Sequence, residues 1–335
     1  MKKFLIATTA LVGTAGVAAA ELSLSGSARV GLTYVEDRGA TSATSGPTLD
    51  ETEIEQRFRF NIRGTAVTDG GVEFSARIRL EANEGDNSST SGRGPGGADF
   101  SIESGGFRLD VGNTSDVADS GDVIDYYGAG IGFTSFLEQN SAFYETGDLN
   151  PLTGAAAAVD RTLPIGGFSA GGTDATTIKL KYSVGDFTAS ASLSNTGTTN
   201  GGGTDVEETQ IGFGYNFGNY SAGIVFGNED GGVEEFVIAT FSGDIGAFGF
   251  SIVVGDADIF TDTAYGASVT YDISSATELR FVVAGGAADV VDVSDDTAYG
   301  IGVRHSLGGG VTLAGGIGSN TGGKTVADLG VTFSF

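Results

Sequence analysis

The chain has no cysteine among its 335 residues and a single histidine, His305. Without cysteine no disulfide can staple the fold, which must be held by burial or by a closed ladder of backbone hydrogen bonds. One histidine without cysteine nearly excludes Ser-His-Asp and Cys-His catalysis and histidine-based zinc chemistry. The sequence therefore predicts no catalytic site, no metal centre and no cofactor.

Basic residues and long apolar runs are also scarce. The 17 Lys and Arg residues stand against 43 Asp and Glu, a formal net charge of −26, which argues against a nucleic-acid partner. Beyond the N-terminal segment, no stretch approaches the roughly 18 to 20 continuous apolar residues that a transmembrane helix requires. Only 4 prolines occur beside 57 glycines, 22 phenylalanines and 10 tyrosines. This composition suits many short strands joined by turns.

The N-terminal segment has the pattern of a secretory signal. Lys2 and Lys3 form a short basic region, residues 4–17 are apolar, and residues 18–20 supply an A-x-A cleavage site before Glu21. The apolar region is too short to span a bilayer as a helix. We expect residues 1–20 to be a cleaved signal peptide that directs export through the Sec pathway.

The C-terminal segment 326–335 is an apolar, alternating strand that ends on an aromatic residue. An unpaired apolar edge invites aggregation, and a barrel that closes its last strand onto its first removes that edge. The segment resembles the strands that the outer-membrane assembly machinery of Gram-negative bacteria reads in its barrel clients. We therefore expect Phe333 and Phe335 to form an assembly signal and the protein to lie in the outer membrane, in contact with its lipid.

Strict alternation of polar and apolar residues recurs along the chain. In residues 53–65, Ile54 and Phe58 lie on one face and Arg57 and Arg59 on the other. A wholly apolar face opposite a charged one suits lipid outside and water inside, and an even strand count returns both termini to the same side. Residues 21–335 are thus predicted to be all-β, a sixteen-stranded antiparallel transmembrane β-barrel. The sixteen strands are expected near residues 21–35, 53–65, 72–81, 99–104, 106–113, 176–183, 186–195, 206–217, 220–228, 233–242, 247–256, 263–273, 277–287, 296–306, 311–319 and 325–335.

The longest connector runs from residue 114 to about 175 and is far beyond ordinary loop lengths, so it is either disordered or functional. Its aromatic residues, among them Tyr126 and Phe143, need somewhere to pack. We expect it to be a long third outer loop folded inward, which would hang its carboxylates in the channel. The predicted acidic residues of the pore constriction are Asp116, Asp119, Asp122, Asp125, Glu138, Glu145 and Asp148.

Arginines gather on the polar face of the first strands and are predicted to form a basic wall of the constriction. A basic wall that faces an acidic loop makes a transverse field, which discriminates solutes by charge, dipole and size. The alternative is that these arginines only pair with carboxylates of adjacent strands, such as Glu53, Glu55, Glu73 and Glu81. The predicted wall consists of Arg29, Arg57, Arg59, Arg77 and Arg79.

Two further motifs have simpler interpretations. Residues 318–325 match the phosphate-binding pattern G-x4-G-K-T, but the residues that follow alternate as a strand, whereas that motif needs a following helix. Aspartate clusters in the predicted outer loops could offer oxygen ligands to Ca²⁺, but without EF-hand spacing the sequence favours solvated acidic loops. These clusters are Asp256, Asp258 and Asp262, and Asp289, Asp292, Asp295 and Asp296.

The whole chain after residue 20 resembles the general porins of Rhodobacter-type alphaproteobacteria. The resemblance is carried by the opening ELSLSGSARVGLTY, the segment TDGGVEFSARIRLEA, the hairpin YNFGNYSAGIVFG and the ending GGGVTLAGGIGSNTGGKTVADLGVTFSF. It implies a sixteen-stranded barrel, a homotrimer and a third loop folded inward as the eyelet of the pore.

The expected function is a water-filled channel for passive diffusion of small hydrophilic solutes and ions. One alternative is a substrate-selective channel with a binding site in the lumen, in which stacked aromatics such as Tyr126 and Tyr127 line the path. Another is a barrel that serves only as an anchor for an enzyme or as an adhesin. The lack of catalytic residues and of a separate passenger domain weighs against that second alternative.

Overall fold

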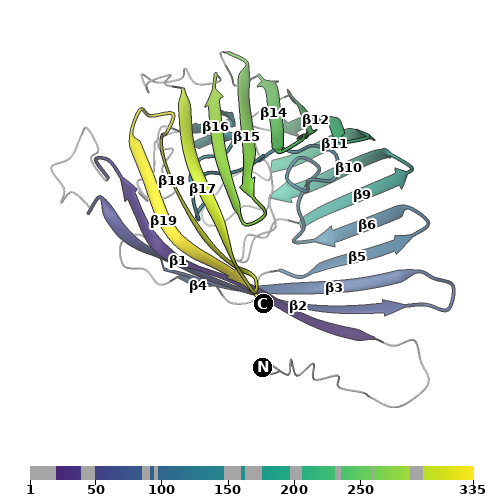
Figure 1. The fold of residues 1–335 in the computed structure, drawn as a ribbon. Coiled ribbons are helices and arrows are strands. Elements are labelled where there is room, and N and C mark those ends of the chain that lie inside the picture. Colours follow the sequence, from purple (N-terminus) through teal and green to yellow (C-terminus); the bar gives the residue numbers. More distant parts are fainter. Residues whose placement is uncertain are drawn as a thin grey trace, which may run out of the picture.

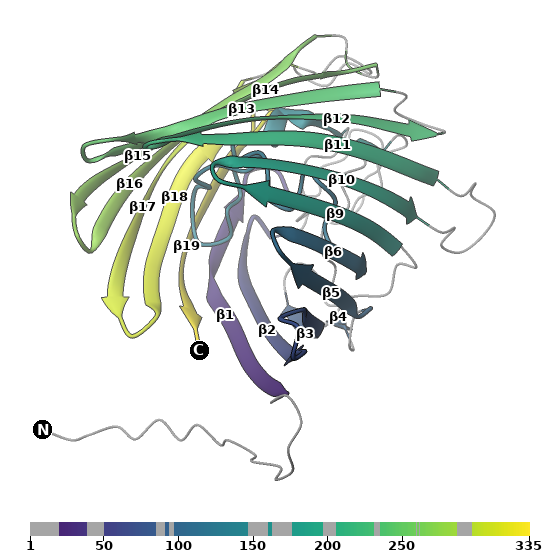
Figure 2. The same cartoon turned by 90° about the vertical axis from the view of Figure 1, so that its right-hand side faces the viewer.

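The computed structural model describes residues 20–38, 50–84, 91–93, 97–146, 160–162, 176–196, 206–230, 235–258, 260, 262–286 and 297–335. The strands form one sheet that curls into a ring (Figure 1, Figure 2). All neighbouring strands in the ring are antiparallel, and β19 returns to β1, where Val30 lies opposite Val331. The ring therefore has no open edge.

Sixteen strand positions make up the barrel, which confirms the predicted count. Strand β4 (Ser91–Arg93) shares one position with β5, because both pair with β3, at its two ends. The other positions agree with the sequence prediction to within a few residues. The barrel strands are β1 (Glu21–Val35), β2 (Thr52–Val67), β3 (Glu73–Glu84), β5 (Asp99–Ser104), β6 (Phe107–Gly112), β9 (Thr176–Val184), β10 (Phe187–Thr196), β11 (Val206–Phe217), β12 (Tyr220–Asp230), β13 (Glu235–Ile245), β14 (Phe248–Ala257), β15 (Ala264–Ser274), β16 (Thr277–Gly285), β17 (Ala298–Gly308), β18 (Val311–Ser319) and β19 (Thr325–Ser334).

The alternation in the sequence sorts side chains onto the two faces of the barrel. Outward residues such as Leu22 and Leu32 are 68% and 52% exposed, although both are aliphatic. Inward residues such as Ser75, Asp99 and Gln210 are polar and buried. A soluble protein buries its apolar face, so this inverted arrangement is the one that suits lipid outside and a polar lumen inside.

Short turns at one end of the barrel depend on glycine. Between β5 and β6, Gly105 and Gly106 have φ angles of 57° and 86°, in the left-handed region that glycine adopts without strain. The longer connector between β6 and β9 contains the helical turn η1 (Ser141–Phe143) and a separate two-stranded sheet, β7 (Tyr144–Thr146) with β8 (Asp160–Thr162). Within the described part of the chain we find no helix with the length and apolar character needed to cross a membrane.

Candidate pore

The connector after β6 runs along the inner wall of the barrel, where its backbone N–H groups donate to wall side chains. The bonds occur in strand order, from β10 to β19, so residues 117–134 follow the wall around the ring. Figure 2 shows the described part of this segment enclosed by the strands. The bonds are Val117 to Ser192 (3.3 Å), Ala118 to Gln210 (2.8 Å), Asp125 to Thr240 (3.2 Å), Ala129 to Ser268 (3.0 Å) and Thr134 to Asp328 (2.9 Å).

We call residues 113–146 the inner segment and the inner faces of β10–β19 the loop-bearing wall. The predicted inward loop extends to residue 175, and residues 147–159 and 163–175 lie outside the described residues. The inward fold of the whole loop therefore stays a prediction.

Apolar side chains of the inner segment form a core inside the barrel. Val117, Ile124 and Tyr126 are 0%, 3% and 1% exposed, and they pack with Val225 and Ile238 of the wall. The ring of Phe143 lies edge-on to that of Tyr126, with centroids 5.6 Å apart. Burial of this kind contributes roughly 1.5–3 kcal/mol per large side chain. Tyr126 and Phe143 of the connector are thus packed inside the barrel, as expected from the sequence.

Glycines on the loop-bearing wall let the inner segment approach the strands closely. A Cβ atom at Gly223 would overlap the carbonyl oxygen of Val123, and one at Gly266 would overlap the carbonyl oxygen of Gln139. Glycine inside a strand commonly marks a place where another backbone comes close. The sequence interpretation took the abundant glycine as turn material and missed this role, although the glycines of β11, β12 and β15 stand at alternate, inward positions.

Two polar anchors hold the turns of the inner segment. Gln139 is fully buried, and its amide donates to the carbonyl oxygen of Asp125 (2.6 Å) and to Ser251 Oγ (3.0 Å). The carboxylate of Asp328 accepts bonds from the backbone N–H of Phe133 (3.2 Å) and of Thr134 (2.9 Å), and from the Thr134 hydroxyl (2.7 Å). Neither residue was singled out from the sequence, because each bonds to groups that lie far away along the chain.

The predicted basic wall lies on the inner faces of β1–β3, and three of its arginines form ion pairs with strand carboxylates. Arg29 lies 2.5 Å from Glu55, and Arg59 pairs with Glu81. Arg77 likewise lies 2.5 Å from Asp99 of β5. Such pairing is what the alternative interpretation expected, yet the same side chains also face the lumen.

Arg57 lies directly opposite Arg29 in the register of β1 and β2. The Nε group of Arg79 donates to Asn61 Oδ1 at 3.3 Å. We call the inner faces of β1–β3 with these five arginines the arginine wall.

The predicted acidic residues do not act as one group. Asp122 bridges Lys179 and Lys181 of β9, at 2.8 Å from each ammonium group. Burial opposes ionisation of Asp122, but the two ammonium groups outweigh it and lower the pKa of this carboxyl. Asp122 is therefore neutralised by lysines of β9, which the predicted constriction did not include.

The remaining acidic residues differ in their surroundings. Asp119 accepts a hydrogen bond from the Tyr127 hydroxyl. Desolvation, aided by the charge of Asp119, raises the pKa of Glu138 to about 7. Asp116 is buried and Asp125 is exposed. The side chain of Glu145 and the whole of Asp148 lie outside the described residues.

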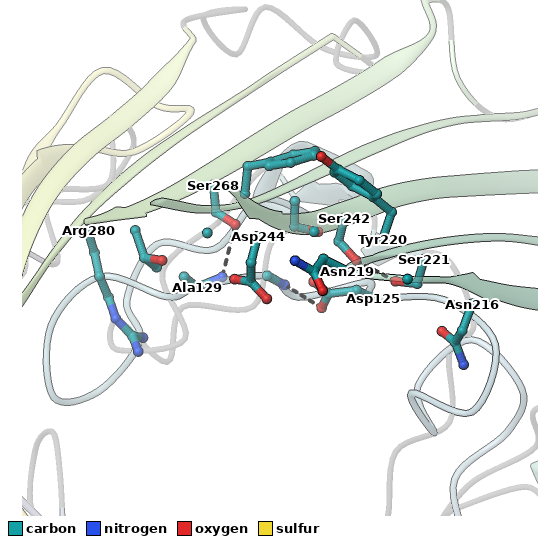
Figure 3. Close-up of a pocket in the computed structure, with 17 residues that line it drawn as sticks. Asp125, Ala129, Asn216, Asn219, Tyr220, Ser221, Ser242, Asp244, Ser268 and Arg280 are labelled. Carbon is teal, nitrogen blue, oxygen red and sulfur yellow. Dashed lines mark hydrogen bonds between the residues drawn. The ribbon is translucent and has the colours of Figure 1, made fainter. Parts of the chain in front are cut away.

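A polar cavity of about 610 Å³ lies between the inner segment and the wall of β11–β16 (Figure 3). Asp125 and Ala129 approach it from the segment, Asp244 and Arg280 line it from the strands, and Asn219 lines it from the turn between β11 and β12. Its lining consists mainly of hydroxyl, amide and charged groups, which fits a water-filled recess of the lumen.

The described residues contain no group of three or more acidic or histidine side chains placed to hold a metal ion. The aspartates at 289, 292, 295 and 296 lie outside these residues, so a Ca²⁺ site there is untested. The phosphate-binding pattern at 318–325 falls at the turn from β18 to β19, where a strand follows instead of a helix.

A closed sixteen-strand barrel with an apolar outer face and a polar inner face has the architecture of an outer-membrane channel of Gram-negative bacteria. The chain belongs to the family of Gram-negative porins, whose family model matches residues 7–325. This membership confirms the resemblance found in the sequence. It also supports a location in the outer membrane.

Individual relatives agree with the family. The chain is 30% identical to the porin of Fuscovulum blasticum over 94% of its own length and 100% of that protein. It is 27% identical to the porin of Rhodobacter capsulatus, again over 94% of this chain and all of the relative. Among solved structures, a triple mutant of the Rhodopseudomonas blastica porin superposes with a TM-score of 0.71 at 25% identity, covering 94% of this chain and 100% of that one.

Proposed function

We propose that this porin lets small hydrophilic solutes and ions diffuse passively through a lumen that is narrowed between the inner segment and the arginine wall. The observation that supports the proposal is the course of the inner segment, which hydrogen-bonds to the inner faces of β10–β19. The arginines lie on the inner faces of the neighbouring strands β1–β3. A barrel of sixteen strands is wide enough to keep an aqueous channel beside such a segment, whereas eight strands would be filled by side chains.

Selectivity in this proposal follows from the imbalance of charge across the lumen. The net charge of −26, together with Asp119 and Glu138 of the inner segment, which have no ion pair among the described residues, favours cations. Arg29, Arg59 and Arg77 are paired with carboxylates, so the basic groups that oppose this preference are mainly Arg57 and Arg304. We therefore expect weak cation selectivity at neutral pH and low salt, where screening is least.

A planar bilayer with a KCl gradient tests the proposal. Stepwise insertion of conducting units with a small cation-directed reversal potential is the expected result. Liposome swelling with neutral sugars of increasing size then gives the exclusion limit. Folded protein that inserts but neither conducts nor admits sugars would contradict the proposal and would favour a barrel that serves only as an anchor.

The alternative of a substrate-selective channel loses one of its supports. Tyr126 is 1% exposed and packs against Phe143, so it offers no face to a passing solute. Tyr127 donates its hydroxyl to Asp119 and packs on the same core. The two rings therefore serve mainly to hold the inner segment in place.

We also propose, from the likeness to the porin family, that the protein forms a homotrimer and is exported through the Sec pathway after cleavage before Glu21. Light scattering on protein purified in detergent would give the number of subunits. Mass spectrometry of the outer-membrane form would give its N-terminus. A monomer, or a chain that retains residues 1–20, would overturn the respective part.

A further inference from the structure

A second cavity, of about 430 Å³, lies between the turn of the inner segment and the inner faces of β1, β2 and β17–β19. Phe133, Thr134 and Ser135 form one side of it. It lies toward the end of the barrel that carries the C-terminus, marked C in Figure 1, because Ser334 and Gly310 also line it. Its volume falls within the roughly 300–1,000 Å³ that is usual for small-ligand sites.

Three guanidinium groups line this cavity, and two of them have no ion-pair or hydrogen-bond partner in the described part of the chain. Arg29 is paired with Glu55 at 2.5 Å. Arg57 forms no ion pair or hydrogen bond within the described residues, although it stands directly opposite Arg29 in the strand register. Like charges that face each other across two strands destabilise the sheet. Among the described residues, only one of the two opposed charges, that of Arg29, therefore has a direct ion-pair partner.

Arg304 of β17 is the second guanidinium for which the described ranges of the chain supply no ion pair or hydrogen bond. Its Nε group is buried and finds no hydrogen-bond partner among the residues that the structure describes. Glu278 lies opposite Arg304 in the register, but its carboxylate accepts a bond from Arg280 at 2.6 Å. A buried N–H group without a partner costs about 1–3 kcal/mol, more when the group is charged. One cavity thus contains two cationic donors, Arg57 and Arg304, that form no direct ion pair with any described residue.

Hydroxyl groups complete the lining of the cavity, together with one carboxyl group that repels an anion when it is ionised. Ser27, Thr312, Thr332 and Ser334 surround the guanidinium groups with further donors. Glu138 also lines the cavity, so at high pH it adds a negative charge beside Arg57 and Arg304, while the charge of Arg29 is already paired with Glu55. Guanidinium groups match the oxygens of phosphate in a bidentate, charge-assisted manner.

We propose that this cavity is a binding site for a small phosphate-like oxyanion, held between Arg57 and Arg304 with Arg29 and the hydroxyl groups as further donors. The inference deepens the proposed function, since an anion bound here would sit in the lumen beside the diffusion path. Inorganic phosphate or the phosphate group of a small metabolite would satisfy the same donors.

Calorimetric titration of inorganic phosphate into the folded full-length protein in detergent tests the site, at constant low ionic strength with chloride as the other anion. We expect saturable binding that weakens at least tenfold in Arg57→Gln and in Arg304→Gln. Glu138→Gln should bind phosphate more tightly above neutral pH. Arg63→Gln is the matched control, because Arg63 lies on the same face of β2 but does not line the cavity.

The outcomes separate this inference from the proposed function. Absence of saturable binding to the wild-type protein, or equal weakening in Arg63→Gln and Arg57→Gln, would overturn the site and leave only a diffuse positive field. Conductance in KCl, measured on the same preparations, reports the pore independently. Each variant is first checked for heat-modifiable migration, and Arg57→Lys, which keeps the charge, supplies a second test if the Gln variant fails to fold. Full retention of affinity in Arg57→Lys would show that charge alone suffices and would overturn the bidentate geometry.

Discussion

The strands on the two sides of the barrel share the same apolar outward residues, but their inward residues differ in chemical character. On the loop-bearing wall, strands present Gly223, Val225 and Gly266 to an overlying segment. On the arginine wall, strands present Arg29 and Arg59 with their paired carboxylates. One side is therefore the interface of a packed core, and the other is a charged surface.

Alternation of polar and apolar residues therefore identifies the inner face of each strand. It does not show whether that face contacts the inner segment or lines the open lumen. Small inward residues accept a second layer of chain, because no side chain keeps it away. On β1–β3 the closely spaced charged residues leave the inner face open to the lumen, because burying several ionic groups together costs more than it returns. Isolated charged residues elsewhere, such as Asp328 and Arg280, are instead satisfied by hydrogen bonds with the inner segment. The residue type at inward positions thus predicts where the lumen is lined by the inner segment and where by the barrel itself.

The sharpest test of the packed side removes an aromatic residue from its core. Phe143 is 0% exposed, so Phe143→Ala should lower the free energy of unfolding by about 3–5 kcal/mol if the inner segment and barrel unfold together. Denaturation of the protein in detergent, followed by near-ultraviolet circular dichroism, measures the change. Phe100→Ala, at an outward position that is 55% exposed, is the control and should lose far less. Equal losses would mean that the inner segment adds no packing energy.

The next test adds volume where the inner segment touches the wall. Gly266→Val places atoms where the carbonyl oxygen of Gln139 lies, and overpacking of this kind costs roughly 1–3 kcal/mol. We expect a lower unfolding midpoint. We also expect larger single-channel currents with more noise, because a displaced inner segment would narrow the lumen less and less constantly. Gly64→Val is the control, because no atom lies within 4 Å of a Cβ built at that position. A variant at Gly266 with wild-type stability and current would show that the close approach does not constrain the segment.

Much of the barrel could be predicted from the sequence, since a lipid-facing strand must alternate and its turns need glycine. It could also be predicted that the aromatic residues of the connector pack in a core, because large apolar side chains favour burial. The anchors could not be predicted: the backbone of Thr134 meets Asp328 across 194 positions of the chain. The partner of each arginine also depends on strand register, and a slip of one residue would change it. Sequence alone therefore left open whether Arg29 meets Glu53 or Glu55, and the register of β1 and β2 selects Glu55.

A third test addresses the arginine wall and should have a smaller effect on stability. The double variant Arg77→Gln, Asp99→Asn removes both members of an ion pair, which is often close to neutral because the desolvation of the two charges disappears with their attraction. We expect the free energy of unfolding to change by no more than about 1 kcal/mol. The single variant Arg77→Gln should be worse, because it leaves the buried carboxylate of Asp99 uncompensated. A double variant as unstable as Phe143→Ala would erase the distinction between the two sides.

The smallest expected effect concerns pH and the charge of the inner segment. Desolvation and the neighbouring Asp119 raise the pKa of Glu138 to about 7, so this carboxyl is mainly protonated at pH 6 and ionised at pH 8. Cation selectivity, read from the reversal potential in a KCl gradient, should therefore rise from pH 6 to pH 8 in the wild-type channel. A raised pKa in the folded state also means that Glu138 favours folding at low pH, and that this contribution fades as pH rises from the carboxyl's ordinary value through about 7.

Glu138→Gln should remove most of the pH dependence of selectivity and keep the pH 6 value throughout. Asp122→Asn is the matched control, because the lowered pKa of Asp122 keeps that group ionised at both pH values. Its loss frees Lys179 and Lys181 from their shared partner, so it should shift selectivity toward anions by a similar amount at pH 6 and pH 8. If Glu138→Gln retained the wild-type pH dependence, the titrating charge would have to lie elsewhere in the lumen. The inner segment would then shape the pore through its volume alone.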